Sequence, residues 1–412
     1  MKKILELLLF VVAFVFGAGL VFVVAAVFFK VDVFGMFVTS ATQVVGVFGD
    51  KFPIISTKYG QVQLRSKSSD KGHVIEIGCA ECTLQHRLLA PVPFTTANAV
   101  LEGVLKKKRF VGDARLYDVM ISIDAQWNEN NVAGSFDLPP TEIGKLYHAV
   151  RSIIPEAEKA QIKGVAGGKG KFSWPEIYFL FKPEIKDFWV DGLVDQDAYK
   201  KGKFRYRAED PDGNPIEVES GEGTSNWITL DEAGAMLPAA VLAVEDNAFY
   251  QHGGYDLESI VAASSFNKKS GRVRRGGSTL TQQLAKNLFL TDERTYSRKL
   301  RELLYAVEIN RELGKQRILE IYLNIVEWGP NIFGAKAAAQ TYFGRAPAQL
   351  LPEEAAWLAN ILRAPKHAYK QQFLKRTPDL TYVTLTLAKM RNLSESQRQT
   401  ALDRGLKFAG QQ

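Results

Sequence analysis

The chain has few residues that bind transition metals or carry thiol chemistry. Its 412 residues include only two cysteines and five histidines. The histidines show no metal-ligand spacing, and Cys79 and Cys82 form one C-x-x-C without the second half that a zinc site needs. No βαβ pattern surrounds the pair, which disfavours a thioredoxin-like redox role. In an oxidising compartment the two thiols could close as a small-loop disulfide.

Acidic residues are fewer than basic ones. The chain has 52 Lys and Arg against 45 Asp and Glu, a formal net charge of +7. This excess favours a negative partner, namely phosphate, anionic lipid head groups or nucleic acid. The hydrophobic fraction of 46% and the charged fraction of 24% are typical of globular proteins and exclude a disordered chain. The length is sufficient for two domains.

Charged residues are absent from residues 7–29. This apolar run is long enough to cross a hydrocarbon core of about 30 Å as a helix. Lys2 and Lys3 precede it, so the positive-inside rule places residues 1–6 in the cytoplasm and the rest outside. The alternative, a cleaved signal peptide, would have a shorter apolar region and an A-x-A-like site. We therefore expect a single-pass anchor and no nucleic-acid partner.

A strand-rich domain is predicted over residues 60–225, after an apolar juxtamembrane neck at 30–59. Apolar residues alternate with polar ones, which predicts a strand with one solvated face. The alternating set is Tyr117, Val119, Ile121, Ile123, Ala125 and Trp127. The cluster of residues 106–109 (KKKR) is interpreted as a solvated turn, with a lipid-facing role as the alternative.

One helix is expected to interrupt these strands. Pro139 and Pro140 open a segment with Thr141 as its N-cap. Apolar residues then recur at helical spacing, at Ile143, Leu146, Val150 and Ile154.

From residue 226 onward the pattern becomes helical. We expect a helical domain at residues 226–375 and a tail of two short helices at 376–412, with Ser394 as a cap. Glu245 follows the apolar run of residues 239–244, so its carboxylate would be partly desolvated. Desolvation raises a carboxyl pKa and makes the group a better proton acceptor near neutrality. The alternative is an ordinary acid at a helix end.

A glycine-rich turn then precedes a polar helix. Gly276 and Gly277 allow the backbone to approach a ligand, and Ser278 is the expected N-cap of a helix whose N-terminus favours an anion. Gln282 and Lys286 are four residues apart and would project from one face.

The next helix combines cations with a second carboxylate. Arg294, Arg298 and Glu302 recur every four residues, which would place them on one stripe. Lys299 adds positive charge, and Gly314 is expected to end the helix. An exposed salt-bridge ladder is the alternative interpretation.

These motifs resemble those of a known family. The strings EDNAFYQHGG, RRGGSTLTQQLAKN, RKLRELLYAVEI and ILEIYLNIVEWGPNIFGAKAAAQTYF are similar to the successive signatures of glycosyltransferase family 51, the peptidoglycan glycosyltransferases. The resemblance implies an all-α, lysozyme-like domain in the periplasm, held at the bacterial inner membrane. It further implies inverting polymerisation of lipid II into β-1,4 glycan strands, with release of undecaprenyl diphosphate.

The resemblance also implies roles for particular residues. Glu245 matches the general base, and Glu302 matches a second carboxylate that assists the leaving group directly or through a divalent cation. No cofactor is expected to be obligatory, and Mg²⁺ or Mn²⁺ near Glu302 is left open. The positions that match the lining of the donor and its diphosphate are Ser278, Gln282, Gln283, Lys286, Arg294, Arg298 and Lys299.

The prediction for the whole chain is a multidomain α+β protein. It comprises an anchor, a strand-rich domain that the resemblance does not cover, and a monofunctional biosynthetic transglycosylase. Its expected partners are lipid II, the nascent glycan strand, the membrane and, through the middle domain, other cell-wall synthesis proteins. The alternatives are an inactive member that acts as a scaffold and a lytic transglycosylase.

Overall fold

A computed structural model describes residues 54–410, except 58–59, 70–71, 80, 86–88, 97–98, 107, 129–130, 175–177, 211 and 260–275. The predicted N-terminus and anchor, and the neck as far as residue 53, lie outside the described residues. Among the described residues, no helix combines the length and the apolar character needed to cross a membrane.

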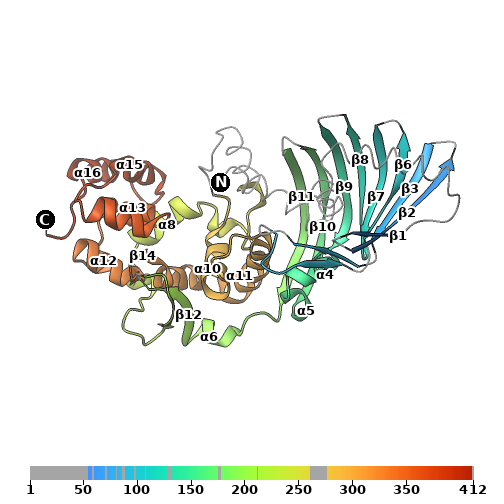
Figure 1. The fold of residues 1–412 in the computed structure, drawn as a ribbon. Helices are drawn as coiled ribbons and strands as arrows, with labels where there is room; N and C mark the ends of the chain where they lie inside the picture. Colours follow the sequence, from blue (N-terminus) through green and yellow to red (C-terminus); the bar gives the residue numbers. More distant parts are fainter. Residues whose placement is uncertain are drawn as a thin grey trace. The chain divides into compact units, whose positions relative to one another are not determined.

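The chain divides into two compact units. The first comprises Met1–Leu193, Leu257–Gly277 and Glu293–Arg301, and the second comprises Val194–Asp256, Ser278–Asp292 and Glu302–Gln412. The first is rich in strands and the second in helices, which confirms the multidomain α+β prediction (Figure 1).

The main element of the first unit, within the described ranges, is a nine-stranded antiparallel sheet that follows chain order (Figure 1). Its strands are β1 (Ile54–Thr57), β2 (Gly60–Ser69), β3 (Gly72–Cys79), β6 (Ala99–Lys106), β7 (Arg109–Leu116), β8 (Val119–Trp127), β9 (Val132–Glu142), β10 (Gln161–Trp174) and β11 (Tyr178–Asp191). The short strands β4 (Cys82–Leu84) and β5 (Phe94–Thr96) form a separate pair. Cys79 and Cys82 are joined by a disulfide between β3 and β4.

The alternation predicted for β8 is confirmed. Val119, Ile121 and Ile123 are each no more than 2% exposed, whereas Met120 is 43% exposed. Successive side chains of a strand point to opposite faces, so one face of the sheet forms a core and the other is solvated.

The predicted helix in this unit starts later than expected. Strand β9 continues through Pro139 and Pro140, and α4 (Ile143–Ala149) begins after Glu142, so the expectation that Thr141 caps it is wrong. The two prolines lie opposite a register shift of β10 between Ala166 and Gly168, where the ladder is interrupted and a missing N–H costs little. The expected apolar positions of the helical segment are nevertheless buried, at Ile143, Leu146, Val150 and Ile154. The segment continues with η1 (Arg151–Ile153) and α5 (Glu156–Lys159).

The second unit is mainly helical but includes two hairpins among its described residues, so it is not all-α. Its first elements are α6 (Gln196–Lys200), β12 (Lys203–Glu209), β13 (Pro215–Gly221), α7 (Leu230–Ala233), α8 (Met236–Glu245), η2 (Phe249–Gln251), α10 (Leu280–Phe289) and α11 (Tyr296–Ile325), of which the part from Glu302 belongs to this unit. They are followed by β14 (Glu327–Gly329), β15 (Ile332–Phe333), α12 (Ala335–Phe343), η3 (Pro347–Gln349), α13 (Pro352–Ile361), α14 (Pro365–Ala368), η4 (Tyr369–Phe373), α15 (Leu380–Lys389) and α16 (Glu395–Arg404).

The hairpin β12–β13 belongs to the helical unit. Phe204 and Tyr206 of β12 are buried in the same core as Trp227 and Leu237. The compact units therefore separate at Leu193 and Val194, before the hairpin, rather than between residues 225 and 226.

Local signals set several helix boundaries in this unit. Thr229 and Glu232 form a capping box at the start of α7. Ser394 forms one with Gln397 at the start of α16, which confirms Ser394 as the predicted cap. Gly314 interrupts α11 with φ +72°, which confirms the predicted break because glycine adopts this conformation without a Cβ clash.

An aromatic cluster joins α12, α13 and the C-terminal segment. The ring centroids of Trp357 and Phe408 lie 4.9 Å apart, and those of Tyr342 and Trp357 lie 5.0 Å apart. The Tyr342 hydroxyl donates a hydrogen bond of 2.8 Å to the Trp328 carbonyl. Each such ring pair contributes about 0.5–1.5 kcal/mol beyond area burial, so the cluster holds these helices as one body.

Replacing Ile121 by Ala should destabilise the strand-rich unit by about 2–5 kcal/mol, because it leaves a cavity in a packed core. The matched control is Met120→Ala on the exposed face of the same strand. Thermal unfolding followed by circular dichroism should show a lower midpoint for Ile121→Ala alone. Equal effects of the two changes would contradict the assignment of faces.

Candidate active site

Glu245 is the last residue of α8. The helix is buried along Leu237, Ala240 and Val241, so its C-terminal end brings Glu245 out of the core. The Oε1 atom of Glu245 is shielded from solvent and has no hydrogen-bond partner among the described residues. A buried carboxylate oxygen without a donor is costly for stability, which makes this atom a candidate for chemistry.

Glu245 Oε2 has one donor, and that donor is itself held in place. The Gln283 amide Nε2 donates to Glu245 Oε2 at 2.8 Å, and the Tyr322 hydroxyl donates to Gln283 Oε1 at 3.0 Å. Tyr322 is fully buried. Burial raises the pKa of Tyr322 well above its usual value, with a further contribution from the negative charge of Glu245. Its hydroxyl therefore stays protonated as a donor, which directs the Gln283 amino group toward Glu245.

Burial raises the pKa of the Glu245 carboxyl above the ordinary glutamate value. The Gln283 hydrogen bond and the positive charge of Arg363 oppose this shift, and the charge of Asp246 adds to it. Desolvation is the largest of these effects, since it disfavours the charged form. The local sequence predicted this direction from the apolar run that precedes Glu245.

The neighbouring Asp246 links α8 to the start of α10. His252 Nε2 lies 3.0 Å from Asp246 Oδ1, and the Leu280 backbone N–H donates to Asp246 Oδ2 at 2.9 Å. The Gly254 N–H donates to His252 Nδ1 at 3.2 Å, so the ring proton is on Nε2 and is donated to Asp246. The carboxylate thus satisfies a backbone donor at the N-terminus of α10, where a negative charge is favourable.

Lys315 is a partly buried charge near this network. Its Nζ lies 4.5 Å from the centroid of the Phe249 ring, and Gly314 breaks α11 directly before it. Burial lowers the pKa of Lys315 to about 8, and the charge of Asp246 opposes this shift. The aromatic face supplies part of the stabilisation that water would otherwise give the ammonium group.

The start of α10 differs from the prediction. Thr279, not Ser278, is the N-cap, and it forms a capping box with Gln282. Thr279 Oγ1 also donates to the Gly254 carbonyl at 2.6 Å, which positions the cap one residue later than expected. Gln282 is buried and its side chain accepts from the Thr279 N–H at 3.1 Å. Its structural role is thus visible, and its contact with a donor substrate stays a prediction.

Lys286 and Glu302 belong to the same unit as Glu245. Lys286 Nζ lies 3.4 Å from Asp292 Oδ1, with 38% of its side chain exposed. Glu302 is 2% exposed on α11. Their expected place beside Glu245 stays a prediction. No group of three or more acidic, His or Cys side chains able to hold a metal ion occurs among the residues that the structure describes.

The remaining predicted cations belong to the first unit. Arg294 is exposed and precedes α11, which begins at Tyr296, so the expected helical stripe does not extend to it. Arg298 lies in the first turn of α11, and its Nε donates to the Glu293 carbonyl. Lys299 follows it in the helix. The contribution of these three residues to a shared groove stays a prediction.

Sequence reasoning missed Asp246, His252 and Tyr322. A detectable signal existed for each. Asp246 breaks the apolar run together with Glu245, His252 follows within the same polar segment, and Tyr322 carries the only hydroxyl within residues 318–326. What could not be seen was the pairing, because Gln283 and Tyr322 are 39 residues apart.

The site has the features of acid–base catalysis. The Glu245 carboxylate is partly buried and has a raised pKa. The Gln283 amide holds one of its oxygens, and the other oxygen has no described donor. Such a group is suited to accept a proton from a substrate hydroxyl.

Comparisons with known proteins identify the class of domain. Residues 212–390 match the family model described as Transglycosylase. The chain is similar to the "Biosynthetic peptidoglycan transglycosylase" of Nitrosomonas eutropha, with 45% identity over 154 residues, and of Cupriavidus metallidurans, with 49% identity over 147 residues. Each match covers 36% of this chain and 63% of the relative. Residues 212–390 therefore form a transglycosylase domain, as the sequence motifs predicted.

A solved structure is also similar in part. Penicillin-binding protein 1A from Haemophilus influenzae matches 50% of this chain and 21% of its own, with 22% identity and a TM-score of 0.26. A TM-score this low does not establish a shared fold.

Asp246→Asn should lower the free energy of unfolding by about 1.5–3 kcal/mol, because one oxygen that accepts hydrogen bonds is replaced by a donor group. Chemical denaturation measures this change. Asp231→Asn, at an exposed position of α7, removes the same charge and should have little effect. Equal stability of the Asp246 variant and the wild type would show that the network does not hold α8 to α10.

Proposed function

We propose that this chain is a peptidoglycan glycosyltransferase that polymerises lipid II into β-1,4 glycan strands. The proposal is supported by the transglycosylase domain and by relatives named biosynthetic peptidoglycan transglycosylase. It is also supported by the burial, the raised pKa and the hydrogen bonding of the Glu245 carboxyl. The single observation that carries the mechanism is the half-satisfied carboxylate, with Oε2 bound by Gln283 and Oε1 without a described donor.

Glu245 would act as the general base. Its carboxylate accepts the proton of the acceptor sugar 4-hydroxyl while that oxygen attacks the anomeric carbon of the donor. The new C–O bond forms as the bond to the diphosphate breaks, and the bonding electron pair leaves with the diphosphate. The raised pKa brings Glu245 closer to neutrality, where a base combines sufficient basicity with a useful deprotonated fraction.

The fixed hydrogen bond determines which oxygen reacts. Gln283 occupies Oε2, so Oε1 is the atom left for the substrate proton. Tyr322 prevents the Gln283 amide from turning its oxygen toward the carboxylate, which would repel it. The chain thus positions its base before substrate binds, and pre-positioned groups cost little reorganisation during reaction.

The leaving diphosphate would be stabilised by positive side chains. In this proposal Lys286, Arg298 and Lys299 contact its oxygens, with Ser278, Gln282 and Arg294 along the donor. Because diphosphate is a good leaving group, cations can replace much of the acid catalysis that hydrolysis of a sugar–sugar bond requires. Glu302 would assist departure directly or through a divalent cation. A single direct displacement inverts the anomeric centre and gives a β-linked product from an α-linked donor.

The substrate determines the expected location. A lipid-linked donor calls for a catalytic domain beside a bilayer, and the apolar residues 7–29 would supply the anchor. In the proposed arrangement the anchor crosses the bacterial inner membrane once, and the transglycosylase domain, with a lysozyme-like fold, lies in the periplasm. The strand-rich unit would serve contacts with other cell-wall synthesis proteins.

Glu245→Gln should reduce polymerisation of labelled lipid II by about 10²–10⁴-fold, the contribution of a positioned general base, while leaving the fold intact. The matched control is Glu217→Gln at an exposed position of β13, which should remain active. Product length on gels measures the outcome. If the wild-type protein forms no glycan product from lipid II, the scaffold alternative is favoured. If it releases short muropeptides from isolated sacculi, the lytic alternative is favoured.

Gln283→Leu should move the acid limb of the kcat/KM profile to higher pH. The Gln283 amide stabilises the charged form of Glu245, so its loss raises the Glu245 pKa further and the active carboxylate is lost earlier as pH falls. Tyr322→Phe keeps the amide and should shift the limb less. An acid limb that stays in place or moves to lower pH in Gln283→Leu would contradict Glu245 as the titrating base.

A further inference from the structure

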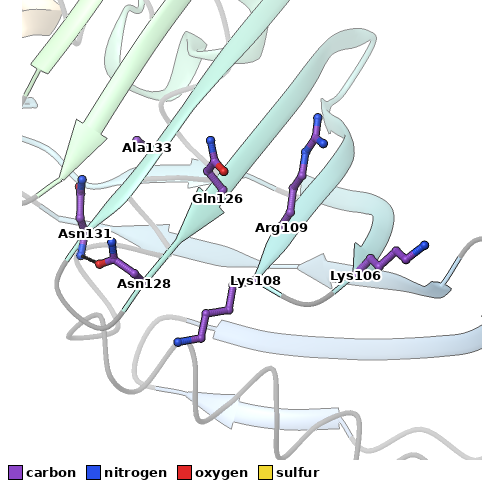
Figure 2. A pocket seen from close by; sticks show the side chains of 7 residues that line it. All are labelled: Lys106, Lys108, Arg109, Gln126, Asn128, Asn131 and Ala133. Carbon is purple, nitrogen blue, oxygen red and sulfur yellow. Dashed lines mark hydrogen bonds between the residues drawn. The ribbon is translucent and has the colours of Figure 1, made fainter.

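A hollow on the solvated face of the sheet is lined by basic and amide side chains. Its volume is about 600 Å³. Figure 2 shows the residues that line it, which are Lys106, Lys108, Arg109, Gln126, Asn128, Asn131 and Ala133. We call it the basic pocket. It belongs to the strand-rich unit, outside the transglycosylase domain.

Strand register explains why these residues meet. Lys106 pairs with Arg109 where β6 turns into β7, Arg109 pairs with Gln126 of β8, and Gln126 pairs with Ala133 of β9. Directly opposed residues of antiparallel strands share a face. The four side chains therefore form one row across four strands, and the small Ala133 leaves space at one end of it.

The arginine of the pocket is held rigidly. Arg109 donates from Nε to Asp124 Oδ1 at 2.8 Å and from Nη2 to Asp124 Oδ2 at 2.6 Å. This bidentate geometry fixes the guanidinium plane. The guanidinium hydrogen bond lowers the Asp124 pKa, so the acid stays ionised. Arg109 thus forms a wall of the pocket, and its own charge is largely balanced.

The two lysines are not balanced in this way. Lys106 and Lys108 are exposed, and neither forms an ion pair with a carboxylate in the part of the chain that the structure describes. No acidic residue is among the residues that line the pocket. Each ammonium group can therefore attract an anion to the pocket.

The opposite side of the pocket carries the amide groups of Asn128 and Asn131. The Asn131 N–H donates to Asn128 Oδ1 at 2.9 Å (Figure 2), and the Asn128 N–H donates to the Asn131 carbonyl at 2.9 Å. These bonds hold Asn128 and Asn131 to each other. The exposed side chains of Asn131 and Gln126 then provide neutral groups that can donate to hydroxyls or to phosphate oxygens.

A neighbouring hollow on the same face differs in charge. It is about 700 Å³ and is lined by Lys169, Lys171 and Lys182 together with three aspartates. Lys169 Nζ lies 3.0 Å from Asp137 Oδ2. Its positive charges are mixed with negative ones, so excess positive charge is a property of the basic pocket and not of the sheet face as a whole.

We propose that the basic pocket binds the phosphate group of a phosphorylated polar molecule. Phosphate offers several acceptor oxygens, which suit lysine ammonium groups and neighbouring amides. The volume is in the range of sites for whole small molecules, about 300–1,000 Å³, so the pocket accommodates a head group as well as its phosphate. The source is either a phospholipid head group or a soluble phosphate ester. The site is independent of the glycosyltransferase chemistry.

The first experiment titrates the full chain in detergent micelles with sn-glycerol 1-phosphate, with glycerol as the negative control, by calorimetry. Lys106→Gln with Lys108→Gln should weaken binding at least about tenfold through loss of charge-assisted hydrogen bonds. Lys171→Gln with Lys182→Gln removes the same charge from the neighbouring hollow and should leave binding within about twofold. Gln126→Ala with Asn131→Ala should weaken binding about threefold, which a diffuse electrostatic effect would not produce.

The second experiment distinguishes the sources. The full chain is reconstituted in nanodiscs of phosphatidylglycerol or of phosphatidylcholine, and lysine acetylation rates are measured by mass spectrometry. Selective protection of Lys106 and Lys108 by phosphatidylglycerol, relative to Lys171 and Lys182, identifies a lipid head group. Binding of glycerol phosphate without this protection identifies a soluble ester. Absence of both effects, or equal weakening by the control pair, would overturn the proposal, and neither result bears on polymerisation of lipid II.

Discussion

The hydrogen bond between Gln283 and Glu245 is the contact on which the candidate active site depends. It places one donor on one oxygen of a partly buried carboxylate and leaves the other oxygen without a described donor. Desolvation raises the pKa of Glu245, and the amide limits that rise. A second donor on the other oxygen would stabilise the charged form further and weaken the base. The site therefore retains a destabilised group, which is a common property of functional sites.

The surrounding structure holds this arrangement through buried polar contacts. Tyr322 fixes the orientation of Gln283, and Asp246 binds both His252 and the first N–H of α10. Glu245 and Asp246 are adjacent in the chain but have different tasks. Asp246 is fully engaged in joining α8 to α10, whereas Glu245 keeps one oxygen available. Their different hydrogen-bond partners, and not their chemistry as carboxylates, produce this division.

The strand-rich unit follows simpler rules. Alternation along each strand separates a packed face from a solvated one, and antiparallel register then decides which exposed side chains become neighbours. Lys106, Arg109 and Gln126 come from three different strands, yet lie in one row because of that register. Three of the pocket residues belong to the sequence cluster at 106–109, and strand register adds Gln126 and Ala133 from other strands. The family resemblance does not extend to them.

The sequence by itself determined the order of strand-rich and helical parts, the buried face of β8, the cap at Ser394, the break at Gly314 and the desolvation of Glu245. These features depend on neighbours within a few residues, which the chain displays directly. Tertiary structure decided that Thr279 caps α10, that Gln282 is used in the cap, that β9 runs through two prolines, and that Tyr322 reaches Gln283. Each of these depends on residues distant in the chain, because packing and register select among local alternatives of similar free energy.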